Sequence, residues 1–176
     1  ENFYSSYNCT GINVKSITDL ELLCNLAMQG SGTGANLEFK NIENFPTVKK
    51  NVPVELTGLG FNSKKGFWEN KVDLEKSPEG NILKIIIGDS RKGWCSAYKG
   101  LIQFFTTEYS PFDDIVDKII IDFSNIRQKG IRLSGFGGIS NPEALPHAFE
   151  RIAEILNHRG SQPTEDGRGL TFEDIA

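Results

Sequence analysis

The residues best suited to chemistry lie in a glycine-rich segment, residues 129–142, which reads Lys-Gly-Ile-Arg-Leu-Ser-Gly-Phe-Gly-Gly-Ile-Ser-Asn-Pro. It holds four of the chain's eighteen glycines and leads into an apolar-periodic run. Glycine lets backbone N–H groups approach a ligand closely, and a helix N-terminus favours an anion. The segment therefore predicts a site for a phosphate or a carboxylate. A tight loop followed by a helix cap would have the same pattern.

Three cysteines, Cys9, Cys24 and Cys95, are the other reactive side chains. Their odd number and wide spacing argue against a disulfide framework and against a Cys-x-x-Cys metal or redox pair. Cys24 and Cys95 fall inside predicted helices, where a packing role is expected. From its surroundings alone, Cys9 is a thiol in a buried strand. With only two histidines in the chain, a zinc site is not expected.

Composition limits the class of protein. A chain of 176 residues with 38% hydrophobic and 24% charged residues fits one globular domain or part of one. Its net charge of −4 gives no basic field for nucleic acid or an anionic membrane. No apolar run approaches the roughly 18 residues of a membrane span, and no signal segment opens the chain. We therefore expect a cytoplasmic protein.

Both ends of the chain look cut. The first residue is Glu1 rather than Met, and Ala176 follows closely after Thr171 and Asp174, a pair that resembles a capping box opening a new helix. We expect a fragment of a longer polypeptide or one half of a split one.

The first elements predict a βαβ unit. A strand over residues 9–15 precedes a helix capped by Ser16 or Thr18. A glycine turn at 30–34 then leads to a second strand over residues 35–39. Such parallel connections are almost always right-handed.

The rest of the chain continues the alternation of strands and helices after an irregular insertion at 41–80, which has one credible strand at 52–56. The further predicted elements are a strand at 82–87, a helix at 91–105 capped by Asp89 or Ser90, a strand at 118–122 and a helix at 143–158. This order indicates an α/β fold. Its strand ends, marked by Ser16, residues 88–90 and the 129–142 segment, are expected to meet at one edge.

Five short motifs then become informative together, because they occur in one order across nearly the whole chain. They are Tyr7-Asn-Cys9, Met28-Gln-Gly-Ser-Gly-Thr-Gly34, Gly88-Asp-Ser-Arg-Lys-Gly-Trp94, Ile121-Asp-Phe-Ser-Asn-Ile-Arg127 and Lys129-Gly-Ile-Arg-Leu-Ser-Gly-Phe-Gly-Gly138 with Asn141-Pro142. In this arrangement the chain resembles the catalytic subunit of ribonucleotide reductase, most closely the monomeric adenosylcobalamin-dependent class II type.

The resemblance implies a fold and a reaction. Residues 1–176 would be a fragment of one catalytic domain, a partial ten-stranded α/β barrel with an irregular insertion. In that family a thiyl radical removes the 3′-hydrogen of a ribonucleotide, the 2′-hydroxyl leaves as water, and a cysteine pair becomes a disulfide. Cys9 resembles the first cysteine of that pair, and Asn8 is expected to contact the substrate.

The resemblance also implies what this chain lacks. The radical-bearing cysteine, its neighbouring glutamate and the second reducing cysteine belong to later strands, and neither Cys24 nor Cys95 matches them. Relatives commonly have alanine at the position of Cys95. We therefore expect the chain alone to be inactive. It would need a thiol reductant and a complementary C-terminal chain or segment. That complementary part would make most of the contacts to adenosylcobalamin.

An effector site is implied as well. The 129–142 segment matches the region where a deoxynucleotide tunes substrate choice in that family. The predicted effector contacts are Ser16, Arg132, Ser134, Gly137 and Gly138. Arg132 could pair with a phosphate, or it could be a solvent-facing charge. In monomeric relatives an insertion replaces the second subunit at this site, and residues 41–80 and 89–125 are both candidates for it.

Two alternatives remain open from the sequence. Residues 135–143 are also similar to the phosphate loop of small-metabolite (β/α)8 barrels, but an extra glycine interrupts the match and no apolar strand follows at 159–170. The second alternative is a non-catalytic nucleotide-binding or assembly module, or a remnant, derived from a reductase.

Overall fold

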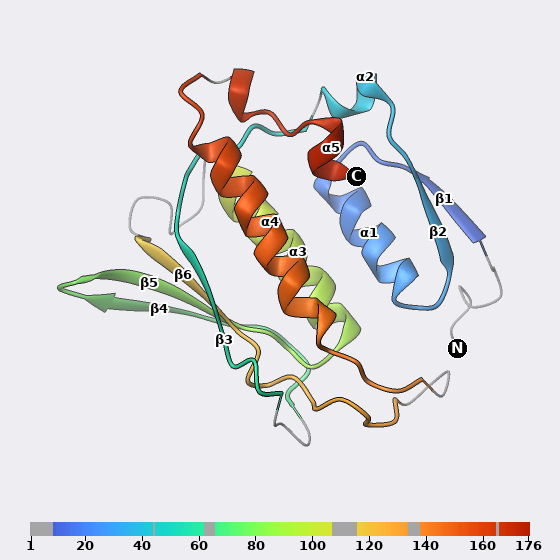
Figure 1. Ribbon diagram of the computed structural model, residues 1–176, viewed down its shortest axis with the longest axis vertical. Helices are drawn as coiled ribbons and strands as arrows, with labels where there is room; N and C mark the ends of the chain where they lie inside the picture. Colours follow the sequence, from blue (N-terminus) through green and yellow to red (C-terminus); the bar gives the residue numbers. More distant parts are fainter. Residues whose placement is uncertain (1–8, 44, 62–65, 107–115, 134–137, 165) are drawn as a thin grey trace.

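The computed structural model describes residues 9–43, 45–61, 66–106, 116–133, 138–164 and 166–176. Its N-terminal unit consists of β1 (Cys9–Asn13), α1 (Ile17–Ala27) and β2 (Gly32–Asn36), and the two strands pair in parallel (Figure 1). The predicted βαβ unit is therefore confirmed. The two strands form a sheet of their own.

The second strand begins earlier than predicted. Gly32 and Gly34, expected in a turn, belong to β2, and Gly34 lies opposite Gly11 of β1. Phe39, expected to end the strand, instead begins α2 (Phe39–Ile42). The sequence pattern fails here because the short side chains of β2 have no apolar alternation. The strand forms through backbone pairing with β1, and four of its five residues are exposed.

A second sheet contains four strands in the order β3-β6-β5-β4. The strands are β3 (Val54–Thr57), β4 (Lys71–Ser77), β5 (Gly80–Ile86) and β6 (Lys118–Asp122). The neighbours β3, β6 and β5 are parallel, and β4 pairs antiparallel with β5. The sequence predicts β3, β5 and β6 but misses β4, inside the segment expected to be irregular. Six of the seven β4 residues are exposed, so no buried face marks this strand.

The two faces of this sheet differ. Its apolar face is formed by Val54, Leu56, Leu83, Ile85, Ile119 and Ile121. The opposite face carries the ion pairs Lys84–Asp122, at 3.2 Å, and Lys118–Glu55. Burial alone would raise the pKa of Asp122, but hydrogen bonds from Ser124 and the Lys84 ammonium outweigh it and hold that pKa below its ordinary value.

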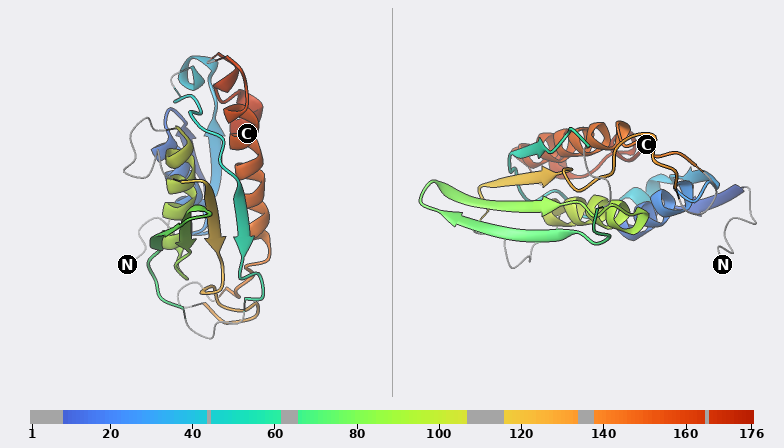
Figure 2. Two further views of the ribbon diagram at one scale, coloured as in Figure 1. Left: turned by 90° about the vertical axis from the view of Figure 1, so that its left-hand side faces the viewer. Right: turned by 90° about the horizontal axis from the view of Figure 1, so that it is seen from below.

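Two long helices, α3 (Arg91–Thr106) and α4 (Ala144–Gly160), pack against each other and contribute to the core with the apolar face of the sheet (Figure 2). Both agree with the predicted helices. Ser90 caps α3, because its Oγ accepts a hydrogen bond from the Gly93 N–H at 2.9 Å.

The chain ends with a 3₁₀ turn, η2 (Asp166–Arg168), and α5 (Phe172–Ile175). As the predicted capping box requires, the Asp174 carboxylate accepts a hydrogen bond from the Thr171 N–H at 2.8 Å.

One hydrophobic core joins the two sheets. α1 packs along α3, and Val14, Ile17 and Leu20 of the N-terminal unit belong to the same buried cluster as Leu101 and Phe105 of α3. Within the described ranges, no helix is long and apolar enough to cross a membrane.

Candidate functional site

The described parts of the 129–142 segment, residues 129–133 and 138–142, pair with each other in antiparallel fashion and are named here the glycine hairpin. Arg132 and Ile139 form an antiparallel bridge, and the Leu133 N–H donates to the Gly138 carbonyl at 2.8 Å. Gly130 has a φ of 89°, which favours glycine. The segment leads into a helix as predicted, because α4 begins at Ala144, but the predicted side-chain cap is not formed.

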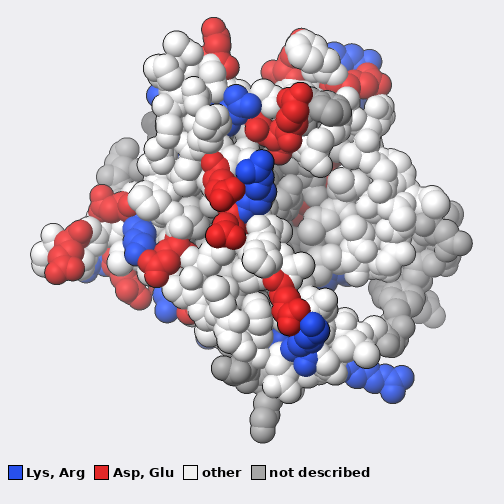
Figure 3. All heavy atoms as spheres, in the orientation of Figure 1, with Lys and Arg blue, Asp and Glu red and all other residues white. Residues whose placement is uncertain are grey.

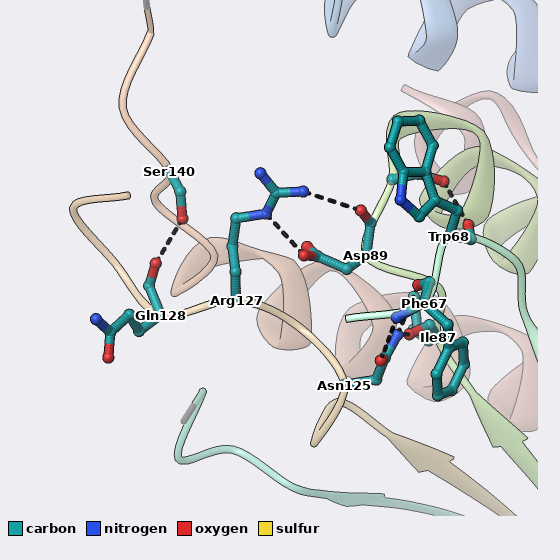
Figure 4. Close-up of polar contacts among 9 residues, drawn as sticks. Phe67, Trp68, Ile87, Asp89, Asn125, Arg127, Gln128 and Ser140 are labelled. Atoms are coloured by element: carbon teal, nitrogen blue, oxygen red, sulfur yellow. Dashed lines mark hydrogen bonds and ion pairs between the residues drawn. The ribbon is translucent and has the colours of Figure 1, made fainter. Parts of the chain in front are cut away.

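Two contacts hold the base of the glycine hairpin. The buried Ser140 donates from Oγ to the Gln128 carbonyl at 2.8 Å, as Figure 4 shows. Lys129 and Glu143 form an exposed ion pair at 2.7 Å. The two arms are thus fixed where the hairpin leaves the rest of the fold.

The predicted effector contacts on the hairpin lie partly outside the described residues. Ser134 and Gly137 fall in the undescribed stretch 134–137. Arg132 and Gly138 are both exposed, and among the described residues the Arg132 guanidinium makes no hydrogen bond or ion pair. An exposed guanidinium beside a glycine-rich backbone is suited to an anion.

Ser16 lies elsewhere. It is the N-cap of α1: its Oγ accepts from the Asp19 N–H at 3.3 Å and donates to the Asp19 carboxylate at 2.8 Å. The hydrogen bond from the Ser16 hydroxyl to the Asp19 carboxylate is the main reason why the pKa of Asp19 is lowered. In Figure 1 the N-terminal end of α1 lies in the upper part of the view, whereas the glycine hairpin lies at the bottom. The N-cap of α1 is therefore not beside the hairpin. A single edge gathering all three strand ends was therefore wrongly predicted, because β1 and β2 form a separate sheet.

The other two strand ends do meet. Arg127, which follows β6, donates from Nε to the carboxylate of Asp89 at 2.7 Å and from Nη2 to the Asp89 carbonyl at 3.1 Å (Figure 4). Asp89 follows β5 and is only 4% exposed. This ion pair joins the carboxyl ends of the two parallel strands just before the chain enters the glycine hairpin.

Asn125 ties a third segment to the same place. Its amide donates to the carbonyls of Phe67 and Ile87 at 3.0 and 2.9 Å and accepts from the Phe67 N–H at 2.9 Å. The Ser90 hydroxyl donates to the Trp68 carbonyl at 2.6 Å. These bonds hold residues 66–68 against the strand ends.

Sequence reasoning missed this polar cluster, formed by Asp89, Ser90, Asn125 and Arg127. It predicted Asp89 and Ser90 as possible helix caps and as part of a strand end that meets the 129–142 segment, but it predicted no contact of Asp89 or Ser90 with Asn125 or Arg127. The available signal was that all four residues belong to two of the motifs that carry the family resemblance. In the structure these motifs contact each other rather than standing apart.

Cys9 is the first residue of β1, and its thiol is free and exposed. The expectation from its surroundings alone, a buried thiol, is wrong, because no described residue covers β1 on the side of Cys9. Asn8 lies outside the described residues. β1 and β2 contain no charged residue, and Figure 3 shows the flank over these strands almost without charged side chains. Among the described residues, no strand pairs with the outer edge of either strand.

The described residues do not fit adenosylcobalamin. They contain no group of three or more His, Cys, Asp or Glu side chains able to hold a metal ion. A groove of about 730 Å³ runs between β3 and α4, but Glu55, His147, Glu150 and Glu154 line it. Such an ionisable lining does not suit a corrin ring, which buries a large apolar surface.

The fold is that of a known class of enzyme. The crystal structure of a B12-dependent (class II) ribonucleotide reductase superposes with a TM-score of 0.68 at 24% identity, covering 90% of this chain and 22% of that one. The family model described as "B12-dependent ribonucleotide reductase, insertion domain" matches residues 60–156, more than half of the chain. The chain belongs to this family.

Two relatives agree with this assignment. The adenosylcobalamin-dependent ribonucleoside-triphosphate reductase of Lactobacillus helveticus is 32% identical over 144 residues, which are 77% of this chain and 19% of that protein. The enzyme of the same name from Lactobacillus leichmannii is 29% identical over 155 residues, 85% of this chain and 20% of that protein. The chain thus spans about a fifth of the length of these relatives.

The resemblance read from the five motifs is confirmed by these matches. Of the two segments considered as the insertion, the match at 60–156 includes all of 89–125 and only residues 60–80 of 41–80. The (β/α)8 phosphate-loop alternative has no support, because the chain belongs to another family.

Proposed function

We propose that this chain is part of an adenosylcobalamin-dependent ribonucleotide reductase and carries one of its two reducing thiols, Cys9. A ribonucleotide and two thiols would be converted to a deoxyribonucleotide, a disulfide and water. The observation that carries the proposal is the exposed Cys9 at the start of β1, in an uncharged parallel sheet of a family member. A thiol that must meet a sugar cannot be sealed within the chain's own core.

The proposal assigns different parts of the chain to different tasks. β1, α1 and β2 would be a piece of the ten-stranded catalytic barrel, whose next strands would pair with the outer edges of β1 and β2. Residues 60–156 would be the insertion domain. The glycine hairpin within them would form part of the effector site. A cytoplasmic location belongs to the proposal, because thiols stay reduced there.

Adenosylcobalamin would supply the radical that starts the reaction, and the complementary C-terminal part would hold it. In this chain, Cys9 would provide one hydrogen and one electron, and Asn8 would position the ribose. The partner thiol of Cys9 would come from the complementary part. The chain alone would therefore be inactive.

For the effector, we propose a deoxynucleotide whose phosphates contact Arg132 and the backbone around Ser134, Gly137 and Gly138. The exposed guanidinium of Arg132 supports this role. The Asp89–Arg127 ion pair lies directly before the hairpin and would hold its base steady. Ser16 would contact the same nucleotide only if α1 and the hairpin came closer together in the assembled enzyme.

The test is reconstitution. The chain, mixed with the C-terminal part of a relative, should reduce a ribonucleoside triphosphate in the presence of adenosylcobalamin and dithiothreitol, measured as deoxyribonucleotide formed. Cys9→Ser should reduce turnover to background, whereas Cys24→Ser, the matched control, should retain it. Binding of the two parts without any turnover would instead favour a non-catalytic assembly module. Equal turnover by the Cys9→Ser mixture would overturn the role of Cys9.

A further inference from the structure

Two cysteines outside the proposed reaction face each other between α1 and α3. The Sγ atoms of Cys24 and Cys95 lie 3.5 Å apart, although 71 positions separate them in sequence. Both are free thiols, and the Met28 Sδ lies 3.8 Å from the Cys95 Sγ. Their spacing in the sequence gave no sign of this pairing.

The two thiols differ in their surroundings. Cys24 is partly exposed, whereas Cys95 is 2% exposed. The Cys95 S–H donates to the Cys24 sulfur, and this bond lowers the pKa of Cys24 and raises that of Cys95. The charged groups nearby are Glu21, which opposes ionisation of both thiols, and Arg91, which favours that of Cys95. The Glu21 carboxylate is itself paired with Lys99 at 2.8 Å.

We propose that Cys24 and Cys95 form a reversible dithiol/disulfide site that reacts with small-molecule disulfides. The Cys24 thiolate attacks the disulfide RS–SR, forming Cys24–S–SR and releasing RS⁻. Cys95 then attacks the Cys24 sulfur, which forms the Cys24–Cys95 bond and releases the second RSH. Two protein thiols are oxidised, and one external disulfide is reduced to two thiols.

The geometry sets this order of events. Within this pair, only Cys24 can meet a reagent from solvent, so it is the attacking thiol, and the buried Cys95 is the resolving one. A disulfide requires an S–S distance of about 2.05 Å, so the sulfurs must approach by about 1.5 Å. Since both side chains extend into one helix–helix contact, side-chain rotation with a small shift of α1 against α3 can supply that movement.

Such a bond would join two parts of the chain. α1 precedes the segment matched by the insertion-domain model, whereas α3 lies within it. Oxidation would therefore fasten the N-terminal βαβ unit to the four-stranded sheet's helices. This inference does not depend on the role proposed for Cys9. That residue is exposed and lies in β1, whereas Cys24 and Cys95 lie in helices.

The experiment treats the reduced full chain with oxidised glutathione, alkylates the remaining thiols under denaturing conditions and measures the intact mass. Peptide mapping should find Cys24 joined to Cys95, with no alkyl group or glutathione on either, whereas the exposed Cys9 carries an alkyl group or glutathione. Dithiothreitol should restore three alkylated thiols. Cys9→Ser, the matched control, should form the same bond and leave no alkylated thiol.

Two further variants test the order of attack. Cys95→Ala should accumulate a stable glutathione adduct on Cys24, whereas Cys24→Ala should leave Cys95 unmodified. Circular dichroism will show whether each variant keeps the helical signal of the native chain. Wild-type protein that ends with glutathione on Cys24 and a free Cys95, or a cross-link that involves Cys9, would overturn the proposal.

Discussion

Individual residues in this chain carry more than one possible role, and Ser16 shows how the structure weighs them. The sequence predicts it both as a helix cap and as an effector contact. Its hydroxyl makes both bonds of a cap with Asp19, so the first role is confirmed. The second role stays a prediction, since Ser16 and the glycine hairpin are not brought together in this chain.

The cap has a measurable stability and pH dependence. Ser16→Ala should lower the free energy of unfolding by about 1 kcal/mol at pH 7. Because the pKa of Asp19 is lowered in the folded state, its contribution is present above its ordinary value of 3.8 and is lost as the pH falls through the folded pKa. The difference between wild type and variant should therefore shrink below that pH.

Urea unfolding at a series of pH values will measure this difference. Thr18→Ala, in the first turn of the same helix, is the matched control and should change stability by less than about 0.5 kcal/mol. A Ser16→Ala effect that grew on acidification would contradict the capping account.

At the scale of elements, the sequence predicts the buried parts well and the exposed parts poorly. The strand 118–122 and the helix α3 carry apolar periodicity, and both form where predicted. β4 and β2 have almost no buried face, so only pairing with a neighbour determines them. Likewise, the contact between Arg127 and Asp89 depends on strand order, which no local pattern contains.

Two glycine variants test how tightly the chain is packed at the end of β5, beside the polar cluster. A Cβ on Gly88 would lie 2.4 Å from the Trp68 carbonyl oxygen, whereas one on Gly100 of α3 would meet nothing within 4 Å. Gly88→Ala should therefore destabilise the chain by about 1–3 kcal/mol. Gly100→Ala, the matched control, should stabilise it by up to about 1 kcal/mol through helix propensity.

Thermal or urea unfolding of both variants will compare them. If Gly88→Ala were as stable as wild type, residues 66–68 would not be held against the end of β5 in solution. The same result would weaken the proposal that the neighbouring strand ends hold the base of the glycine hairpin steady.

At the scale of the whole molecule, the shared core makes a prediction about cooperativity. Leu20 of α1 is 8% exposed and belongs to the cluster that also contains the α3 residues. The two sheets should therefore unfold together, with tryptophan fluorescence and far-ultraviolet circular dichroism following one urea transition.

Leu20→Ala should lower the free energy of unfolding by about 2–5 kcal/mol, and both probes should report the same decrease. Leu22→Ala on the same helix is the control, since Leu22 is 44% exposed, and it should cost less than about 1 kcal/mol. Separate transitions for the two probes would mean that the βαβ unit melts independently of the four-stranded sheet.

β4, one of the two edge strands of the four-stranded sheet, differs in chemistry from β1 and β2 of the smaller sheet. β4 carries Lys71, Asp73, Glu75 and Lys76. Such charges on an edge strand disfavour pairing with a strand of another molecule. β1 and β2 carry none. In concentrated solution, aggregation should therefore begin by strand pairing at β1 and β2. A lysine introduced on either strand should reduce precipitation.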